Sequence, residues 1–246
     1  MIVHTYPDVI QTARELALSL ADDIKKSIQA RKAYTLALCG GNSPVYYLSQ
    51  LAMQSIDWNW VHIFWAHERV VSPDSHHSNF KLAQQYLFDR IMIPHQNIHR
   101  IKGELRQMAL NDYIQDIQTF FKKRIIFDCV VLGLNIKGYL SPFYAQSPVS
   151  DPDSGEVAMV SPHPYKSETQ RIGLTLPIVN QARRIVLFVT GQDKSQVLKQ
   201  FYNAQSGIKR SKSFYPVLNP EALEIYTDID LKINPAGNRK TGPSGR

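Results

Sequence analysis

The residues best suited to chemistry are Gly40-Gly41-Asn42-Ser43-Pro44, which join an apolar run to a predicted helix. Backbone amides in the first turn of a helix have no partner within the helix, and the helix dipole makes that end partly positive. Such a segment can hold a phosphate through its amides and a hydroxyl. The spacing matches neither the Walker loop nor the dinucleotide fingerprint, so on its own it also fits a simple Gly-Gly turn.

Alternating strands and helices are expected to position this loop. Apolar runs predict strands at residues 34–39, 61–65, 127–132 and 184–190. Three- and four-residue apolar spacing and capping signals predict helices that follow Thr5-Tyr6-Pro7-Asp8 and that span residues 44–53, 79–90, 105–123 and 192–202. This alternation is typical of an α/β fold, a mostly parallel Rossmann-like sheet with helices on both faces. We expect one domain over residues 1–235 and a basic, disordered tail over 236–246.

Ligands of such folds bind outside the carboxyl ends of the strands, so the residues directly after each predicted strand are the candidates for a site. Four segments qualify, at residues 40–44, 66–69, 133–139 and 191–194.

The chain has 246 residues, with 28 Lys and Arg against 21 Asp and Glu, a net charge of +7. Much of the excess lies in Lys209, Arg210 and Lys212 and in the tail, so we expect solvated loops and no nucleic-acid partner. No apolar stretch is long enough to span a membrane, and the start lacks a secretory pattern, which predicts a cytoplasmic protein. Cys39 and Cys129 lie in apolar runs, where we expect buried thiols and no disulfide.

A metal site is not expected from the histidines. His76 and His77, with Asp74 and His67, offer ligand types, but adjacent histidines on one loop point apart and no second ligand cluster follows.

Several motifs match one family in order along the chain. The loop Cys39-Gly40-Gly41-Asn42-Ser43-Pro44 is similar to that family's Ser-Gly-Gly-Ser-Thr-Pro. Further similar segments are residues 56–58, 61–65, 68–69, 78–80, 98–104, 171–177 and 189–194. On these motifs the chain, from about residue 7 to 231, resembles the 6-phosphogluconolactonases, within the wider group that includes the glucosamine-6-phosphate deaminases.

The resemblance implies a fold of this group (NagB-type), no cofactor and no metal, and a six-carbon sugar lactone phosphate as the small-molecule substrate. Glu68-Arg69 and Ser78-Asn79 favour the lactonase branch, because the deaminases resemble Asp-Glu-Tyr at the first position. A phosphate dianion binds best to amide donors together with fixed cations. The implied phosphate-binding residues are Gly40, Gly41, Asn42, Ser43, Arg171 and Lys194.

The chain departs from the family at the positions closest to the chemistry. The family's Gly-x-Asp-Gly-His segment corresponds to residues 135–139, which place Lys137 at the aspartate and Tyr139 at the histidine. His67 stands where the family's Gly-Asp-Glu-Arg has an acid.

Lactone opening needs a base that takes a proton from water, with a pKa near the working pH. Tyrosine ionises near 10, whereas an unperturbed histidine ionises near 6.5, so His67 is the better-matched base. Lys137 could favour the phenolate of Tyr139, and Lys137 or Arg69 could stabilise the oxyanion. The catalytic candidates are therefore His67, Arg69, Lys137 and Tyr139.

Two readings stay open. In the first, the protein hydrolyses 6-phosphogluconolactone in the pentose phosphate route with weakened or relocated catalysis. In the second, Tyr139, Pro142, Phe143 and Tyr144 only fill the cleft, and the protein is an inactive homologue that binds a sugar phosphate. The oligomeric state is not predicted by either reading.

Overall fold

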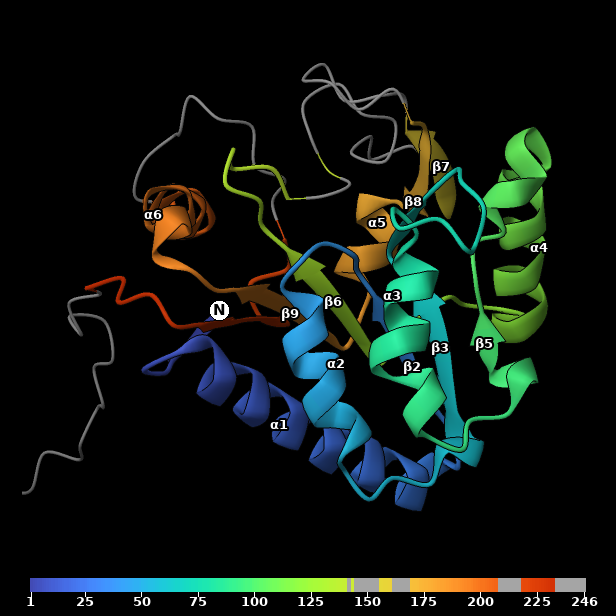
Figure 1. Cartoon of the computed structure of the whole chain (residues 1–246), viewed down its shortest axis with the longest axis horizontal. Coiled ribbons are helices and arrows are strands. Elements are labelled where there is room, and N and C mark those ends of the chain that lie inside the picture. The colour runs from blue at the N-terminus through green and yellow to red at the C-terminus, as the bar shows by residue number, and fades with distance from the viewer. Residues whose placement is uncertain (141–142, 144–154, 161–168, 208–217, 233–246) are drawn as a thin grey trace, which may run out of the picture.

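A seven-stranded parallel sheet forms the centre of the computed structural model, which describes residues 1–140, 143, 155–160, 169–207 and 218–232 (Figure 1). The strand order is β1-β10-β9-β6-β2-β3-β5, and each neighbouring pair is parallel. The strands are β1 Ile2–Thr5, β2 Tyr34–Leu38, β3 Val61–Trp65, β5 Ile98–His99, β6 Cys129–Gly133, β9 Arg184–Val189 and β10 Leu223–Thr227. The predicted α/β class is confirmed.

A second, antiparallel sheet of three strands was not predicted. It consists of β4 His67–Arg69, β8 Arg171–Leu174 and β7 Val157–Val160, in the order β4-β8-β7. Only Ala66 separates the end of β3 from the start of β4, so this small sheet begins at the carboxyl edge of the large one.

Six helices of the described residues surround the large sheet. They are α1 Val9–Arg31, α2 Pro44–Ala52, α3 Asn79–Tyr86, α4 Ala109–Phe121, α5 Leu176–Asn180 and α6 Ser195–Gln205. Figure 1 shows α2 and α3 beside each other, both starting at the edge where the parallel strands end.

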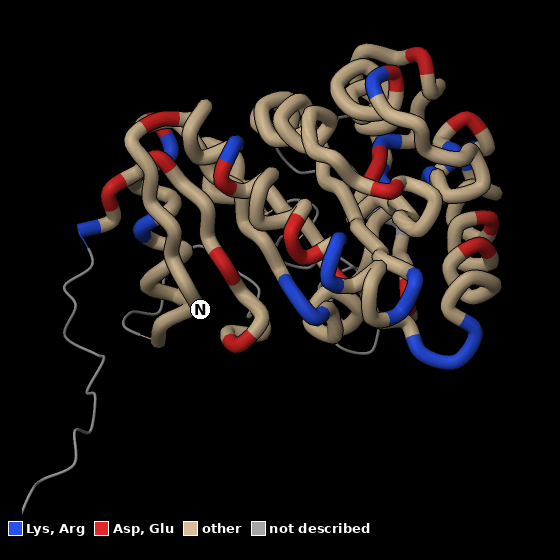
Figure 2. Tube along the Cα trace, turned by 90° about the horizontal axis from the view of Figure 1, so that it is seen from below, with Lys and Arg blue, Asp and Glu red and all other residues tan. Residues whose placement is uncertain are grey.

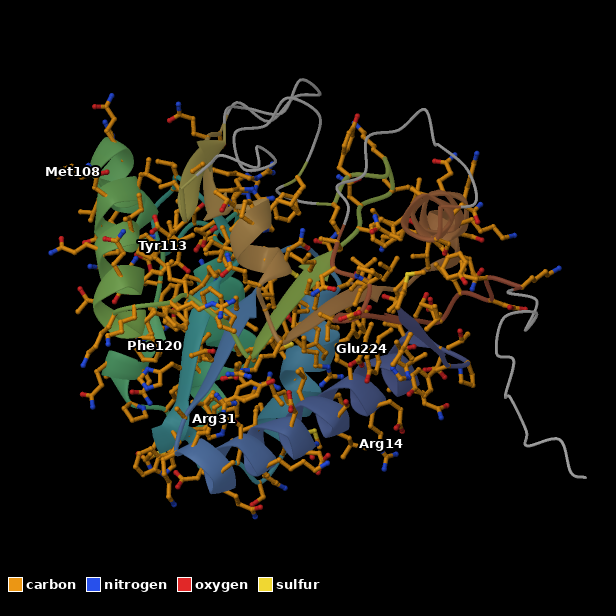
Figure 3. All side chains as sticks on the ribbon, turned by 180° about the vertical axis from the view of Figure 1, so that it is seen from behind. Arg14, Arg31, Met108, Tyr113, Phe120 and Glu224 are labelled. Carbon is orange, nitrogen blue, oxygen red and sulfur yellow. The ribbon has the colours of Figure 1, made fainter. Side chains whose placement is uncertain are left out.

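Two neighbouring aromatic residues of β3 show that helices cover both faces of the sheet. Side chains of consecutive strand residues point to opposite faces. Phe64 meets Phe120 and Phe121 of α4, with ring centroids 5.3 and 5.7 Å away, whereas Trp65 meets Phe80 of α3 at 5.8 Å. Figure 3 shows the side chains of α4, with Phe120 and Tyr113 labelled, beside the strands. The predicted covering of both faces is therefore confirmed.

Several helix ends differ from the prediction because 3₁₀ turns replace the predicted first or last turn of α-helix. Asp8 caps α1 by accepting from the Gln11 amide at 2.8 Å, while Thr5 ends β1. A 3₁₀ turn at Gly103–Met108 precedes α4, and another at Gln192–Lys194 precedes α6, so both helices begin later than predicted. The helix predicted for residues 79–90 ends at Tyr86, before a further 3₁₀ turn.

The hydrophobic core runs through the centre of the large sheet. Every residue of β2 is buried, as a strand covered on both faces requires. Cys39 and Cys129 are buried free thiols, and burial raises the pKa of each to about 12. In the part of the chain that the structure describes, no helix is both long and apolar enough to cross a membrane.

Charged residues of both signs are interspersed over the described chain (Figure 2). Lys209, Arg210, Lys212 and the predicted tail at 236–246 lie outside the described residues.

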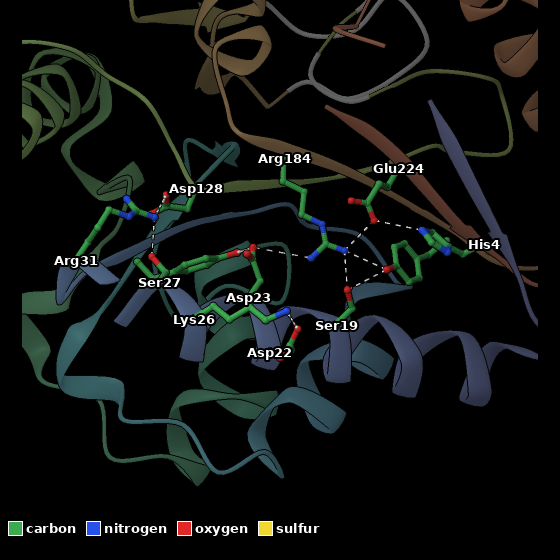
Figure 4. Close-up of polar contacts among 12 residues, drawn as sticks. His4, Ser19, Asp22, Asp23, Lys26, Ser27, Arg31, Asp128, Arg184 and Glu224 are labelled. Carbon is green, nitrogen blue, oxygen red and sulfur yellow. Dashed lines mark hydrogen bonds and ion pairs between the residues drawn. The ribbon is translucent and has the colours of Figure 1, made fainter. Parts of the chain in front are cut away.

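A network of polar side chains ties α1 to the amino ends of the strands, opposite the predicted site (Figure 4). Arg184, the first residue of β9, uses Nη2 to donate to Ser19 Oγ at 2.8 Å, Glu224 Oε2 at 2.9 Å and the Tyr226 hydroxyl at 3.0 Å. Glu224 also contacts Nε2 of His4 in β1, at 3.3 Å. The network thus joins β1, β9, β10 and α1.

Candidate functional site

A cavity of about 370 Å³ opens at the carboxyl edge of the large sheet, and all four predicted segments contribute to it. The strand order changes direction here, because β2 lies between β3, which follows it in the chain, and β6, which comes later. Such a switch point separates the loops after two adjacent strands and leaves room for a ligand. The cavity is lined by Cys39, Gly40, Gly41, Asn42, Ser43, Pro44, His67, Arg69, Gly133, Leu134, Asn135, Ile136, Arg171, Phe188, Asp193 and Lys194.

The loop between β2 and α2 lines the cavity and leads into the first turn of α2. Pro44 occupies the first turn of α2, where its missing N–H removes no helical hydrogen bond. Gly41 has a φ of +111°, a conformation that L side chains rarely adopt. Gly41 and Asn42 are exposed, so the start of α2 is open to a ligand.

Two arginines and a histidine of the small sheet share one face. Arg69 and Arg171 are directly paired across β4 and β8, and His67 precedes Arg69 by two residues on the same strand. Like charges in directly opposed positions repel each other. A bound anion would relieve this repulsion, which makes the pair suited to a phosphate or a developing oxyanion.

The third cation, Lys194, follows β9. Its Nζ donates to the carbonyl of Thr190 at 2.6 Å, which holds the ammonium at the end of the strand and leaves further N–H donors. Asp193, beside it, is the one carboxylate among the described residues that line the cavity.

His67 is buried, and its electrostatic surroundings oppose protonation. Burial, and then the charges of Arg171 and Arg69, lower the pKa of His67 to about 3. The imidazole is therefore neutral at physiological pH, and it is a weaker base than the sequence-based argument from an ordinary histidine assumed. An anion bound between the two arginines would offset part of this effect and raise the pKa.

The loop after β6 is folded around Asn135. Its side-chain Oδ1 accepts from the amides of Lys137 at 2.9 Å and Tyr139 at 3.0 Å. Residues Gly133 to Ile136 line the cavity, whereas Lys137 is exposed and Tyr139 half-buried in the same loop, outside the lining. Phe143 is fully buried, and Pro142 and Tyr144 lie outside the described residues.

The structure thus brings eight of the ten predicted site residues to one cavity, all except Lys137 and Tyr139. Asn135, Ile136 and Asp193 also line the cavity and were not predicted individually, although all three lie in the predicted segments that follow strands. Asn79 of α3 contacts Arg69 and His67 of this site, and the sequence indicated it only as part of the Ser78-Asn79 motif.

The described residues hold no group of three or more His, Cys, Asp or Glu side chains that could bind a metal ion. The rings of His76 and His77 lie next to each other, with centroids 3.8 Å apart, so the expectation that these two histidines point apart is wrong.

Comparisons with known proteins give a consistent result. The family model of glucosamine-6-phosphate isomerases/6-phosphogluconolactonase matches residues 7–217. The chain is similar to the 6-phosphogluconolactonase of Aggregatibacter actinomycetemcomitans, with 30% identity over 77% of this chain and 82% of that protein. Among solved structures, the devB protein superimposes with a TM-score of 0.80 and 27% identity, covering 95% of this chain and 99% of the other. The 6-phosphogluconolactonase of Thermotoga maritima shares the fold, with a TM-score of 0.77 at 21% identity over 92% of this chain and 98% of that one.

Proposed function

Because the chain belongs to the glucosamine-6-phosphate isomerase/6-phosphogluconolactonase family, we propose that it hydrolyses 6-phosphogluconolactone to 6-phosphogluconate, a step of the pentose phosphate pathway. The single observation that carries this proposal is the meeting of the Gly40 to Ser43 loop with three cations, Arg69, Arg171 and Lys194, in one cavity. The partner is then a small-molecule sugar phosphate, not a nucleic acid or a membrane.

The phosphate of the substrate binds, in this proposal, to the loop and to two of the cations. The amides at the start of α2 and the Ser43 hydroxyl donate to its oxygens. Arg171 and Lys194 supply the positive charge, and a guanidinium can offer two parallel donors. No metal or cofactor is part of the scheme.

Hydrolysis joins one water to the lactone. The water oxygen bonds to the carbonyl carbon as it loses a proton, and the carbonyl oxygen becomes an oxyanion. The intermediate then expels the ring oxygen, which takes up a proton. The acid so formed releases a proton at neutral pH. We assign stabilisation of the oxyanion to Arg69, whose charge is close to His67 on the same face of β4.

Two groups are proposed for the proton transfer. His67 is neutral and can accept a proton, and a bound phosphate raises its basicity as described above. Tyr139, two residues after Lys137 in the loop after β6, is the second candidate, although neither residue lines the cavity. Comparing His67→Gln with Tyr139→Phe assigns the role: the variant that lowers kcat with an unchanged KM identifies the base.

The test is the release of protons from fresh 6-phosphogluconolactone, measured above its spontaneous hydrolysis. The full-length protein is expected to accelerate it, and the Arg171→Met/Lys194→Met double variant is expected to raise KM by at least tenfold. Arg14→Met, at an exposed position on α1, serves as the control. A rate equal to that without protein, together with a thermal shift by 6-phosphogluconate, would favour the inactive sugar-phosphate-binding homologue instead.

We also propose that the protein acts in the cytoplasm. Two buried thiols without a disulfide are typical of reducing compartments. Cell fractionation tests this location.

A further inference from the structure

Asn79, the first residue of α3, contacts three parts of the candidate site at once. Its side-chain Oδ1 accepts from Nη1 of Arg69 at 3.3 Å, and its Nδ2 donates to the main-chain carbonyl of His67 at 2.7 Å. The same amide group lies directly against Gly40 of the loop before α2. One side chain therefore contacts the loop at Gly40, the main chain of β4 at His67 and the side chain of Arg69.

The contact with Gly40 is steric. A Cβ atom added at Gly40 would lie 1.7 Å from Asn79 Oδ1 and 2.1 Å from its Cγ. Atoms cannot approach that closely. The loop backbone at residue 40 can therefore lie this close to the Asn79 side chain only because the residue is glycine. The reason differs from that at Gly41, where a positive φ, and no steric contact, favours glycine.

The backbone of Asn79 is itself fixed. Asn79 is 2% exposed, and its amide donates to Glu68 Oε1 at 2.9 Å. The other oxygen, Glu68 Oε2, accepts from the Phe80 amide at 2.8 Å and from the Ser78 hydroxyl at 3.0 Å. These hydrogen bonds tie the start of α3 to β4. They therefore fix the position of the Asn79 side-chain amide relative to Gly40 and Arg69.

Hydrogen bonds from this region fix the orientation of the Arg69 guanidinium. Its Nη1 donates to the carbonyl of His77 at 2.7 Å as well as to Asn79. These two acceptors engage one end of the guanidinium, while Arg69 lines the cavity. A guanidinium has five N–H donors in a rigid plane, so holding one end fixes the direction of the remaining donors.

We propose that Asn79 is a positioning residue for anion binding. It orients the Arg69 guanidinium, and its side-chain amide fixes the position of the loop backbone at Gly40. The inference rests on the proposed function and names a residue that acts on substrate through its neighbours. Asn79 itself is not assigned a contact with the substrate.

The main test is a double-mutant cycle between Asn79→Ala and Arg69→Met. In the otherwise native protein, Asn79→Ala is expected to lower kcat by about tenfold, because Arg69 is no longer oriented toward the oxyanion, and to weaken the binding of inorganic phosphate through the loss of its contact with Gly40. In the Arg69→Met background the same change is expected to alter kcat by less than about twofold, because the residue that it positions is gone, while the loss of phosphate binding through Gly40 remains.

Asn97→Ala is the matched control. Asn97 is also a buried asparagine, 4% exposed, and its Nδ2 also donates to main-chain carbonyls, those of Trp58 and Asn59. It does not line the cavity. We expect it to lower stability with kcat and phosphate binding unchanged. If Asn79→Ala behaves in the same way, Asn79 is only structural and the proposal is wrong.

The steric contact between Gly40 and Asn79 is tested separately. Gly40→Ala is expected to lower the melting temperature strongly in the native background and much less in the Asn79→Ala background, where the clashing amide is absent. Equal losses in both backgrounds would contradict a steric contact. Calorimetric titration with inorganic phosphate reports on positioning even if the lactone is not hydrolysed, so a failure of the proposed function and a failure of this inference give different results.

Discussion

His67 is a neutral imidazole enclosed in protein and flanked by two guanidinium groups. Its pKa in the folded protein is about 3, whereas an unfolded chain restores the ordinary value near 6.5. Between these values the unfolded state binds one more proton than the folded state. The free energy of unfolding therefore rises with pH across this window and falls on acidification.

The corresponding prediction concerns the pH dependence of stability. From pH 6 down to pH 4, His67 should lower the free energy of unfolding by about 1.4 kcal/mol per pH unit. The variant His67→Gln should lose this component of the slope, while the half-buried His62, whose pKa is lowered to about 4, contributes equally to both proteins. Urea unfolding at several pH values measures the difference. Parallel curves for the two proteins would contradict the buried, neutral state.

The two thiols give a second prediction at this scale. Thiolate is the reactive form, and burial raises the pKa of Cys39 and Cys129 to about 12. Neither should react with iodoacetamide at pH 8 in the folded protein, although Cys39 lines the cavity. Both should react in urea. Mass spectrometry of the labelled protein distinguishes the cases, and rapid labelling of native Cys39 would show that the cavity wall opens.

At the scale of elements, the start of α3 depends on the Glu68 carboxylate. It accepts from the amides of Asn79 and Phe80 and from the Ser78 hydroxyl, as well as from its neighbour Arg69. Burial raises the pKa of Glu68, and these hydrogen bonds oppose that rise.

Glu68→Gln should therefore destabilise the protein by about 1–3 kcal/mol, because a neutral amide oxygen cannot satisfy all of these donors. The exposed pair Asp22 and Lys26 on α1 offers a control, since Asp22→Asn should cost less than about 0.5 kcal/mol. Urea unfolding at pH 7 measures both changes. Equal effects would mean that the Glu68 hydrogen bonds add nothing beyond an exposed pair.

The elements that the sequence predicts well are those whose signal is local. β2, β3 and β9 are apolar runs buried on both faces, and their predicted bounds agree with the structure to within one residue. β1 and β10 mix apolar and polar residues, and β4, β8 and β5 have two to four residues each. Those strands exist because of partners far away in the chain, a dependence that local patterns do not contain.

The site follows the same division. The loop at Gly40 is predictable because small residues between a strand and a helix indicate a strand-to-helix turn from neighbouring residues alone. The role of Asn79 is spatial, because it depends on β4 and α2 meeting at the start of α3, so a single sequence offers no signal for it. The pKa of His67 also depends on a cross-strand partner, Arg171, about a hundred residues away.

At the scale of the whole molecule, the network around Arg184 secures the edge opposite the cavity. The Arg184 side chain is 12% exposed and meets acceptors from α1 and β10. Replacing one partner of a largely buried ion pair leaves the other charge without compensation, a cost of about 3 kcal/mol or more.

Arg184→Met should accordingly lower the free energy of unfolding by about 3 kcal/mol while leaving KM unchanged, because the residue lies at the amino end of β9 and the cavity at the carboxyl ends. Figure 3 shows Arg14 on the outer side of α1, where the same substitution should cost less than about 0.5 kcal/mol. Chemical unfolding and the lactone assay together check this. A change in KM for Arg184→Met would show that the two edges are energetically coupled.

The pairing of β1 with β10 also has a consequence for biosynthesis. β1 and β10 lie at opposite ends of the described chain, yet they pair in the sheet, with Ile2 opposite Glu224. β1 therefore stays without this partner until β10 has been synthesised. β2, β3 and β5 can pair earlier, so the loop from Gly40 to Ser43 can fold before β1 takes its place in the sheet.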